Sequence, residues 1–367
     1  MGKEVASVRY SRERSREFRS KVRQGLDVLE TMLAHRQFDA ETPMTGIEIE
    51  LNLVDHAGDP SFHNAEVLRL IADPDYQTEL ARYNIELNSA PRPLTGDSAF
   101  DREQELRDSL NRAAARALEH GARIVMIGIL PTLHPEHLRQ ESISADRRYS
   151  ALNDAILLSR GEDIELEIEG PSGERMRTCA DSITPEAACT SVQLHVQVSP
   201  SEFPAYWNAA QAISGPQVGL AANSPFFLGK RLHAETRIEL FKQAIDTRPI
   251  ELRNQGVRPR VFFGESWVTS IFDLFEENTR YFPCLLNELS DEDPMEVLGS
   301  GRTPELAELR LHNGTIWRWN RPIYDVVDGR PHLRVENRVL PAGPTVIDMM
   351  ANAAFYYGLI RALATSD

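Results

Sequence analysis

Five short segments of the chain alternate between apolar and polar residues, and such alternation is typical of strands that bury one face. The apolar positions carry Ile, Leu and Val, whereas the polar positions carry mainly Glu, His, Gln, Asn and Arg. The segments are GIEIELNLV (46–54), NIELN (84–88), SVQLHVQVS (191–199), ELRLH (308–312) and LRVENRV (333–339), in which Asn337 intrudes on the apolar side. Each pattern alone is also typical of a half-exposed strand whose polar face is simply wet.

Three longer segments predict helices. Residues 11–38 place Phe18, Val22, Leu26, Leu29 and Leu33 at steps of three and four, with a basic outer face. RNA- and membrane-binding helices share this pattern, but a solvated helix packed on the domain is favoured in an acidic chain. A second helix is expected over 97–119, ending near Gly121, and a third over 346–364. The apolar run 122–131 between them predicts a buried strand.

The segment from residue 134 to 188 is polar and interrupted by glycines. Within it, IELEIEGPSGERMRT predicts a hairpin that turns at Pro-Ser-Gly, with the carboxylates of Glu165, Glu167 and Glu169 in solvent. We expect this segment to form a peripheral hairpin or flap near the site. Because no repeat or low-complexity linker interrupts the chain, we predict a single catalytic domain over 1–367, with the N-terminal helix within 1–38.

Charge and composition narrow the class of protein. A formal net charge of −15 argues against nucleic-acid binding, which needs a basic face. The N-terminus has no apolar signal region and no run of about 18 apolar residues occurs, so neither export nor membrane binding is supported. The three cysteines lack zinc-site spacing. We therefore expect a cytoplasmic protein with small-molecule partners, and the sequence is compatible with a homo-oligomer.

Taken together, the polar strand faces are rich in residues that bind ions. Glu48, Glu50, Glu86 and Glu336 would repel one another on one sheet face unless cations lay between them. Mg²⁺ prefers such oxygen ligands, and His195 could add a nitrogen donor or bind substrate instead. These carboxylates therefore predict a magnesium site.

Arginines on the same faces suit phosphate or carboxylate groups. Arg310, Arg334 and Arg338 offer planar forks of donors, although each could equally pair with a neighbouring Glu. Carboxylate-held metal together with arginine is typical of phosphoryl transfer. Because GxxxxGK[ST] and GxGxxG are both missing, we expect any nucleotide to lie on the sheet.

An aromatic element, HNGTIWRWNRPIYD, precedes the last predicted strand. Trp317 and Trp319 could stack on adenine or shape an amine pocket, but a packing cluster around an Asn-Gly hairpin turn is favoured. Asn320 and Arg321 are polar candidates for the rim of the pocket. Asn88 and Gln193, on the polar faces of their strands, are expected to bind substrate with Arg334.

At these residues the chain resembles the glutamate–cysteine ligase family 2, carboxylate–amine ligases of the glutamine-synthetase-like group. The resemblance spans roughly residues 46–357 and rests on motifs that occur in the family's order. These are TGIEIELNLVD, ELNSAPRPL, SVQLHVQVS, ANSPFFLGK with Arg237 downstream, and RVENRVLPAGPT. It implies an α+β fold like that of glutamine synthetase and guanidino kinases. In that fold an antiparallel sheet curves into a saddle or half-barrel, helices cover the outer face, and ATP and Mg²⁺ lie in the hollow.

The resemblance also implies roles for individual residues. Arg237, Arg310 and Arg338 would contact phosphates or the acid substrate, and the metal ligands would be Glu48, Glu50, Glu86, His195 and Glu336. The implied reaction is ATP-dependent amide formation through an acyl phosphate, most simply from glutamate and cysteine to γ-glutamylcysteine in glutathione biosynthesis. Two alternatives are a guanidino-kinase-like phosphotransferase and a non-catalytic metabolite-binding relative.

Overall fold

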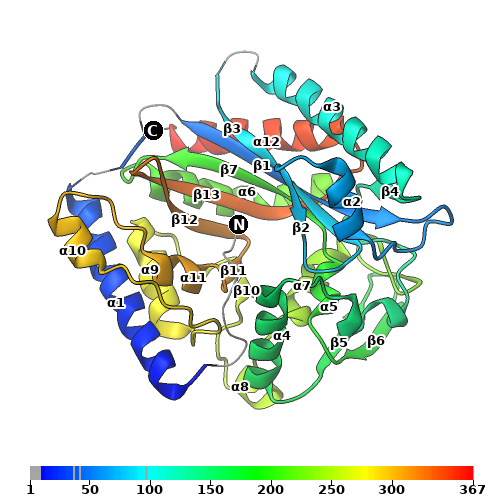
Figure 1. The fold of residues 1–367 in the computed structure, drawn as a ribbon, viewed down its shortest axis with the longest axis horizontal. Helices are drawn as coiled ribbons and strands as arrows, with labels where there is room; N and C mark the ends of the chain where they lie inside the picture. Colours follow the sequence, from blue (N-terminus) through cyan, green and yellow to red (C-terminus); the bar gives the residue numbers. More distant parts are fainter. Residues whose placement is uncertain (1–9, 36–37, 41–42, 96–97, 367) are drawn as a thin grey trace.

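A seven-stranded antiparallel sheet lies at the centre of the computed structural model, which describes residues 10–35, 38–40, 43–95 and 98–366 (Figure 1). The strand order is β12-β13-β7-β1-β3-β2, and β4 pairs with the end of β1. Their bounds are β1 Met44–Val54, β2 Tyr76–Thr78, β3 Asn84–Pro93, β4 Arg123–Val125, β7 Ser191–Val198, β12 Asn320–Val327 and β13 Arg330–Pro341.

One face of this sheet packs against helices. Helix α6 (Phe203–Ala221) lies on β13, α12 (Val346–Ala364) packs beside α6, and α3 (Ser98–Glu119) follows next to α12. The apolar positions of the alternating segments, among them Ile49, Leu194 and Val335, are fully buried. Burying these side chains forces the polar residues of the same strands onto the opposite face.

The opposite face is bordered by two groups of elements (Figure 1). The first comprises α4 (Arg147–Arg160), β5 (Ile164–Glu169), β6 (Arg175–Ala180), α5 (Thr184–Ala187) and α7 (Thr236–Ala244). The second comprises α1 (Arg12–His35), α9 (Ile271–Tyr281), α10 (Pro294–Gly299) and α11 (Ala307–Asn313). Shorter elements complete the described chain: α2 Asn64–Ile71, η1 Pro135–His137, η2 Gln140–Ser142, β8 Phe226–Phe227, β9 Lys230–Arg231, α8 Ile250–Asn254, β10 Val261–Phe262 and β11 Trp317–Arg318.

Most of the predicted elements are confirmed. Four of the five alternating segments are strands β1, β3, β7 and β13, and the predicted helices are α1, α3 and α12. The predicted hairpin is β5–β6, where Gly173 has a φ of 80° and the outer glutamates are exposed. Within the described residues, none of the helices has the length and apolar character needed to cross a bilayer.

Three predicted elements differ in the structure. The prediction of a strand over 308–312 is wrong, because ELRLH lies in helix α11. The run 122–131 forms only the short strand β4. The Asn-Gly hairpin is also wrong: Trp317 belongs to β11, which pairs in parallel with β10.

The asparagine that interrupts the apolar face of β13 is held in a buried amide cluster. Asn337 donates to Gln217 of α6 at 3.1 Å and to the side-chain oxygen of Asn320 at 2.7 Å. Gln217 donates back to Asn337 at 2.8 Å, and Asn320 donates to Ser214 at 3.2 Å. Each amide therefore satisfies its neighbours, which is what burial of a polar group requires.

We expect Asn337→Ala to lower the free energy of unfolding by about 1–3 kcal/mol, because Gln217 and Asn320 would lose buried partners. Urea denaturation measures this change. The matched control is Asn254→Ala, at an exposed position of α8, where we expect a change within about 0.5 kcal/mol. An equal effect of both substitutions would contradict the importance of the cluster.

Candidate active site

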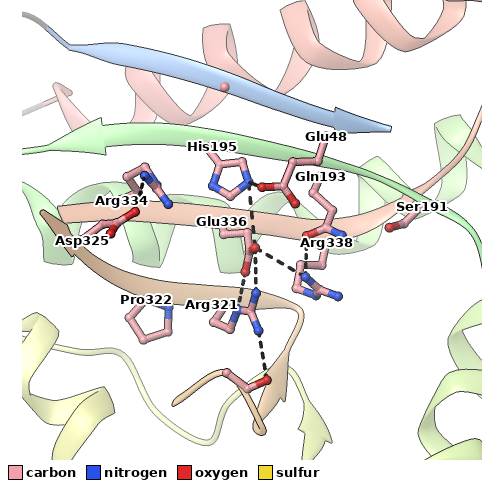
Figure 2. Close-up of polar contacts among 12 residues, drawn as sticks. Glu48, Ser191, Gln193, His195, Arg321, Pro322, Asp325, Arg334, Glu336 and Arg338 are labelled. Atoms are coloured by element: carbon pink, nitrogen blue, oxygen red, sulfur yellow. Dashed lines mark hydrogen bonds and ion pairs between the residues drawn. The ribbon is translucent and has the colours of Figure 1, made fainter. Parts of the chain in front are cut away.

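Polar side chains of four neighbouring strands meet on the open face of the sheet (Figure 2). In the ladder, Arg321 of β12 lies opposite Glu336 of β13, which lies opposite His195 of β7. One step along, Gln193 of β7 lies opposite Glu48 of β1. The register alone therefore brings residues from distant parts of the chain together.

Glu48, His195 and Glu336 form the centre of this face. The Nε2 atom of His195 lies 3.1 Å from Oε1 of Glu48 and 3.9 Å from Oε1 of Glu336. One ligand atom of each residue lies within 4.8 Å of the others, a spacing that suits a single cation. Nε2 of His195 thus faces two carboxylate oxygens, and its Nδ1 is buried without a hydrogen-bond partner among the described residues. An imidazole nitrogen between two carboxylates fits a metal ligand.

Two arginines hold the Glu336 carboxylate. Arg321 donates from Nη2 to Oε1 of Glu336 at 2.9 Å and from Nε to Oε2, while Nη1 of Arg338 lies 3.4 Å from Oε1. Burial alone would raise the pKa of Glu336, but Arg321, Arg338 and His195 lower it well below its usual value. For Glu48, burial is outweighed by His195, so the pKa falls to about 2. Both carboxylates are therefore anions at neutral pH.

Glu50 is anchored by donors from β7. Its carboxylate accepts hydrogen bonds from the backbone N–H of Ser191 at 2.7 Å, the Ser191 hydroxyl at 2.9 Å and the side-chain amide of Gln193 at 2.9 Å. The carbonyl oxygen of Gln193 in turn accepts from Arg338. Burial still raises the pKa of Glu50, although Arg338 and Ser191 oppose the shift. The orientation of Glu50 is thus fixed before any ligand binds.

A second acidic group continues from Glu50 across β3, and two of its members were missed by sequence reasoning. Burial together with Glu48 and Glu79 raises the pKa of Glu86 well above its usual value. Burial, Glu50 and Glu186 raise the pKa of Glu79 to about 7. Glu79 follows β2 and Glu186 lies in α5, so neither belongs to an alternating strand pattern. The only signal in the sequence is that Glu79 shortly precedes the predicted strand of Glu86, and Glu186 shortly precedes that of His195.

Three further candidates lie around this centre. Asn88 lies opposite Glu48 in the ladder, and its side-chain nitrogen is buried without a partner among the described residues. Arg334 lies one row beyond Glu336 and contacts Asp325 at 3.4 Å and His332 at 2.9 Å. Arg310 reaches the same Asp325 from helix α11 and pairs with Glu305 at 2.7 Å. Because it comes from a helix, Arg310 does not share a strand face with the other arginines.

Two predicted residues are buried in contacts with other protein groups. Asn320 is fully buried in the amide cluster beside α6, so it does not line the rim of a pocket. Arg237 is also buried: its Nε donates to Glu235 at 3.0 Å and its Nη2 to the carbonyl of Arg338 at 3.2 Å. Its guanidinium lies over the ring of Trp319 at 5.5 Å, and Trp319 packs against aromatic neighbours rather than facing the hollow.

The acidic cluster makes stability depend on pH. Burial and Glu50 raise the pKa of Glu186 from 4.5 to about 8, against the opposing effect of Arg338. Because the pKa of Glu186 is raised in the folded state, the contribution of this group to stability is complete below pH 4.5 and is lost as the pH rises to about 8. In EDTA, we therefore expect the free energy of unfolding to fall over this window, and to fall less in Glu186→Gln.

Urea denaturation at several pH values within that window measures the effect. Glu165→Gln, at an exposed position of β5, serves as the control and should keep the wild-type pH dependence. An unchanged pH dependence in Glu186→Gln would show that this carboxyl group does not titrate as described.

Comparison with known proteins relates this site to a family. Residues 44–367 match the model for Glutamate-cysteine ligase family 2. A crystal structure of glutamate–cysteine ligase from Francisella tularensis in complex with AMP is similar at a TM-score of 0.51 and 12% identity, covering 90% of this chain and 68% of that one. A bifunctional glutathione synthetase from Pasteurella multocida aligns with a TM-score of 0.41 and 15% identity, over 91% and 40% of the two chains.

A search of curated proteins finds no significant match. The structural likeness nonetheless confirms the expected fold, an α+β architecture with a strongly curled antiparallel sheet. The family model covers nearly the whole chain, including every strand that contributes to the open face. The chain therefore belongs to the glutamate–cysteine ligase family 2, whose members are ATP-dependent carboxylate–amine ligases.

Proposed function

We propose that this protein uses ATP and Mg²⁺ to join an amino acid carboxylate to an amine through an acyl phosphate, most simply glutamate and cysteine to give γ-glutamylcysteine. The observation that carries the proposal is the convergence of Glu48, His195 and Glu336 on one sheet face, with Arg321 and Arg338 beside them. Anionic ligands for a cation and cationic donors for a phosphate then lie side by side.

The donor set fits magnesium. Glu48, Glu336 and His195 would hold one ion, and Glu50, Glu79 and Glu86 offer further oxygens nearby. Oxygen predominates in this set, which favours Mg²⁺ over softer metals. When bound, the metal supplies charge that neutralises the phosphates of ATP as the substrate carboxylate approaches.

The arginines supply the rest of the positioning. Arg338, which already contacts Gln193 and Glu336, has a planar fork that suits a phosphate or carboxylate oxygen. Asn88 and Gln193 offer amides on the same face, and Arg334 lies one row away. Phosphoryl transfer relies mainly on such positioning and charge neutralisation, so no protein nucleophile is required.

The chemistry has two displacements. The substrate carboxylate oxygen attacks the γ-phosphorus of ATP, forming a carboxyl–phosphate bond as ADP leaves. The neutral amine then attacks the acyl carbon, phosphate leaves, and the amide nitrogen loses a proton. Activation is needed because a carboxylate oxygen is a poor leaving group until it is phosphorylated. The buried polar side chains of the open face favour these two steps because they hold the charged reactants in fixed positions.

The two alternatives receive less support. The cysteine closest to the site in sequence, Cys189, is buried, and its sulfur lies near backbone carbonyls of Pro185 and Arg237. Burial raises the pKa of Cys189 well above its usual value, so it is a protonated thiol and not the reactive thiolate that a guanidino kinase would use. A metabolite sensor would have no need to keep several mutually repelling buried carboxylates.

ADP release tests the substrate pair. With Mg²⁺-ATP, we expect rapid ADP release only when glutamate and cysteine are both present, because the acyl phosphate is consumed by the amine. Glutamate alone and cysteine alone are the controls. Release with another acid and amine pair but not with this one would keep the reaction type and refute γ-glutamylcysteine synthesis. Phosphorylation of a guanidino compound that needs no amine partner would instead support the kinase.

Magnesium binding is tested without turnover. A ligand of the native state adds about 2.7 kcal/mol of stability at 100 times its Kd, so Mg²⁺ should raise the melting temperature of the wild-type protein relative to EDTA. Glu48→Ala should fold, since it removes one of the charges that repel Glu86, but should lose both this response and turnover. The matched control, Glu165→Ala on the exposed face of β5, should respond like the wild type. A full response in Glu48→Ala would contradict the assignment.

A further inference from the structure

Strand β13 carries a β-bulge at the point where it enters the site. Asn337 lies opposite Leu194 of β7, and Leu340 lies opposite Val192. The step on β13 is three residues while the step on β7 is two, so Arg338 and Val339 share the place opposite Gln193. A bulge of this kind redirects a side chain and leaves backbone groups outside the regular ladder.

A buried arginine of helix α7 binds the backbone of this bulge. The Nη2 atom of Arg237, in α7, donates to the carbonyl oxygens of Arg338, at 3.2 Å, and of Val339. The side chains of Arg237 and Glu235 are only 2% and 4% exposed, and Nε of Arg237 lies 3.0 Å from Oε1 of Glu235. One guanidinium thus joins both bulge carbonyls to a buried carboxylate.

The Glu235–Arg237 pair is itself fixed on both sides. The second oxygen of Glu235 accepts from the backbone N–H of Asn223 at 2.9 Å. The side-chain amide of Asn223 donates to the carbonyl of Ala342, just beyond β13, at 2.8 Å. The backbone N–H of Arg237 donates to the hydroxyl of Ser224 at 3.1 Å. The segment 223–237 is therefore bonded to the end of β13 at several points.

The side chain of Arg338 itself faces the acidic centre. Its Nη1 contacts the carbonyl oxygen of Gln193 and lies 3.4 Å from Glu336, and Gln193 donates to Glu50 at 2.9 Å. Any slip of the bulge would displace this guanidinium together with the backbone that carries it.

We propose that the Glu235–Arg237 pair is a positioning device that holds the β13 bulge and so aims Arg338 into the site. Arg237 acts through Arg338, and this differs from the phosphate or substrate contact that the family resemblance implies for it. The inference rests on the proposed function only where turnover is the readout, since the bulge and the orientation of Arg338 can be observed directly.

A double-mutant cycle tests this role. Arg237→Lys keeps the charge but cannot reach both carbonyls and Glu235, and we expect kcat to fall about 100-fold, as for a misplaced catalytic group. The KM for ATP should change less than about threefold. Once Arg338→Lys has been introduced, adding Arg237→Lys should cause little further loss, because the two residues act as one unit. Losses that multiply in the double variant, or a selective rise in the KM for ATP, would overturn the proposal in favour of direct contact.

The matched control is Arg160→Lys. Arg160 is also buried and donates to a backbone carbonyl, that of Asp246 at 3.1 Å, but among the described residues none of its hydrogen bonds or ion pairs reaches β13. It should lower the melting temperature while leaving kcat within about threefold of wild type. Equal losses of turnover in Arg160→Lys and Arg237→Lys would show a general loss of folding and would also overturn the proposal.

Two further measurements keep the test decisive. If Arg237→Lys does not fold, Glu235→Gln replaces it in the cycle, since the amide keeps an acceptor for Arg237 but loses the charge. A crystal structure of the folded variant gives a readout that needs no activity, and we expect Arg338 to have left Gln193. An unchanged Arg338 would refute positioning even if the protein proved to be a ligase of other substrates. Absence of ADP release with every substrate would refute the proposed function alone.

Discussion

Repulsion among buried carboxylates is the constraint on which this structure depends. Six glutamates, Glu48, Glu50, Glu79, Glu86, Glu186 and Glu336, influence one another on the open face of the sheet or beside it. Their environments differ. Where arginine or histidine outweighs burial, as at Glu336 and Glu48, the pKa falls; where burial or neighbouring carboxylates dominate, as at Glu50 and Glu86, the pKa rises. Glu48 and Glu336 are thus ionised at neutral pH, whereas carboxyl groups with a raised pKa, such as that of Glu86, bind a proton more readily when no cation is bound.

The strands of the site could be predicted from the sequence because their apolar sides are buried against helices. That burial fixes the side-chain period of two, and the period places Glu48, His195 and Glu336 on the opposite face. The strand predicted over ELRLH was wrong for a related reason, because five residues are too few to distinguish the side-chain period of a strand, 2, from that of a helix, 3.6. In α11, Leu309 is buried and Glu308 accepts hydrogen bonds from Ser290, so these residues are also well accommodated in a helix.

Other parts of the site depend on contacts that no local pattern carries. Glu79 directly follows β2 and Glu186 lies in a four-residue helix, and only the tertiary fold brings them to Glu50. Arg321 was predicted as a residue of the pocket, but its pairing with Glu336 could not be predicted, because this cross-strand pair depends on the β12–β13 register. Asn337 looked like a flaw in an apolar face, yet amides from α6 and β12 satisfy it. The order of the motifs indicated the family, whereas these contacts between distant residues could be identified only from the structure.

The order of strands in the sheet has a consequence for biosynthesis. β1 lies in the middle of the sheet, but its neighbour β7 and the next strand, β13, are made much later, and β13 supplies Glu336 and Arg338. A growing polypeptide on the ribosome would therefore display Glu48 and Glu86 long before their balancing partners exist. In the unfolded chain water solvates these carboxylates, so their mutual repulsion arises only as the sheet forms and buries them. A chain that ends before β13 would lack Glu336 and Arg338, and therefore part of the candidate cation site and of its counter-charges.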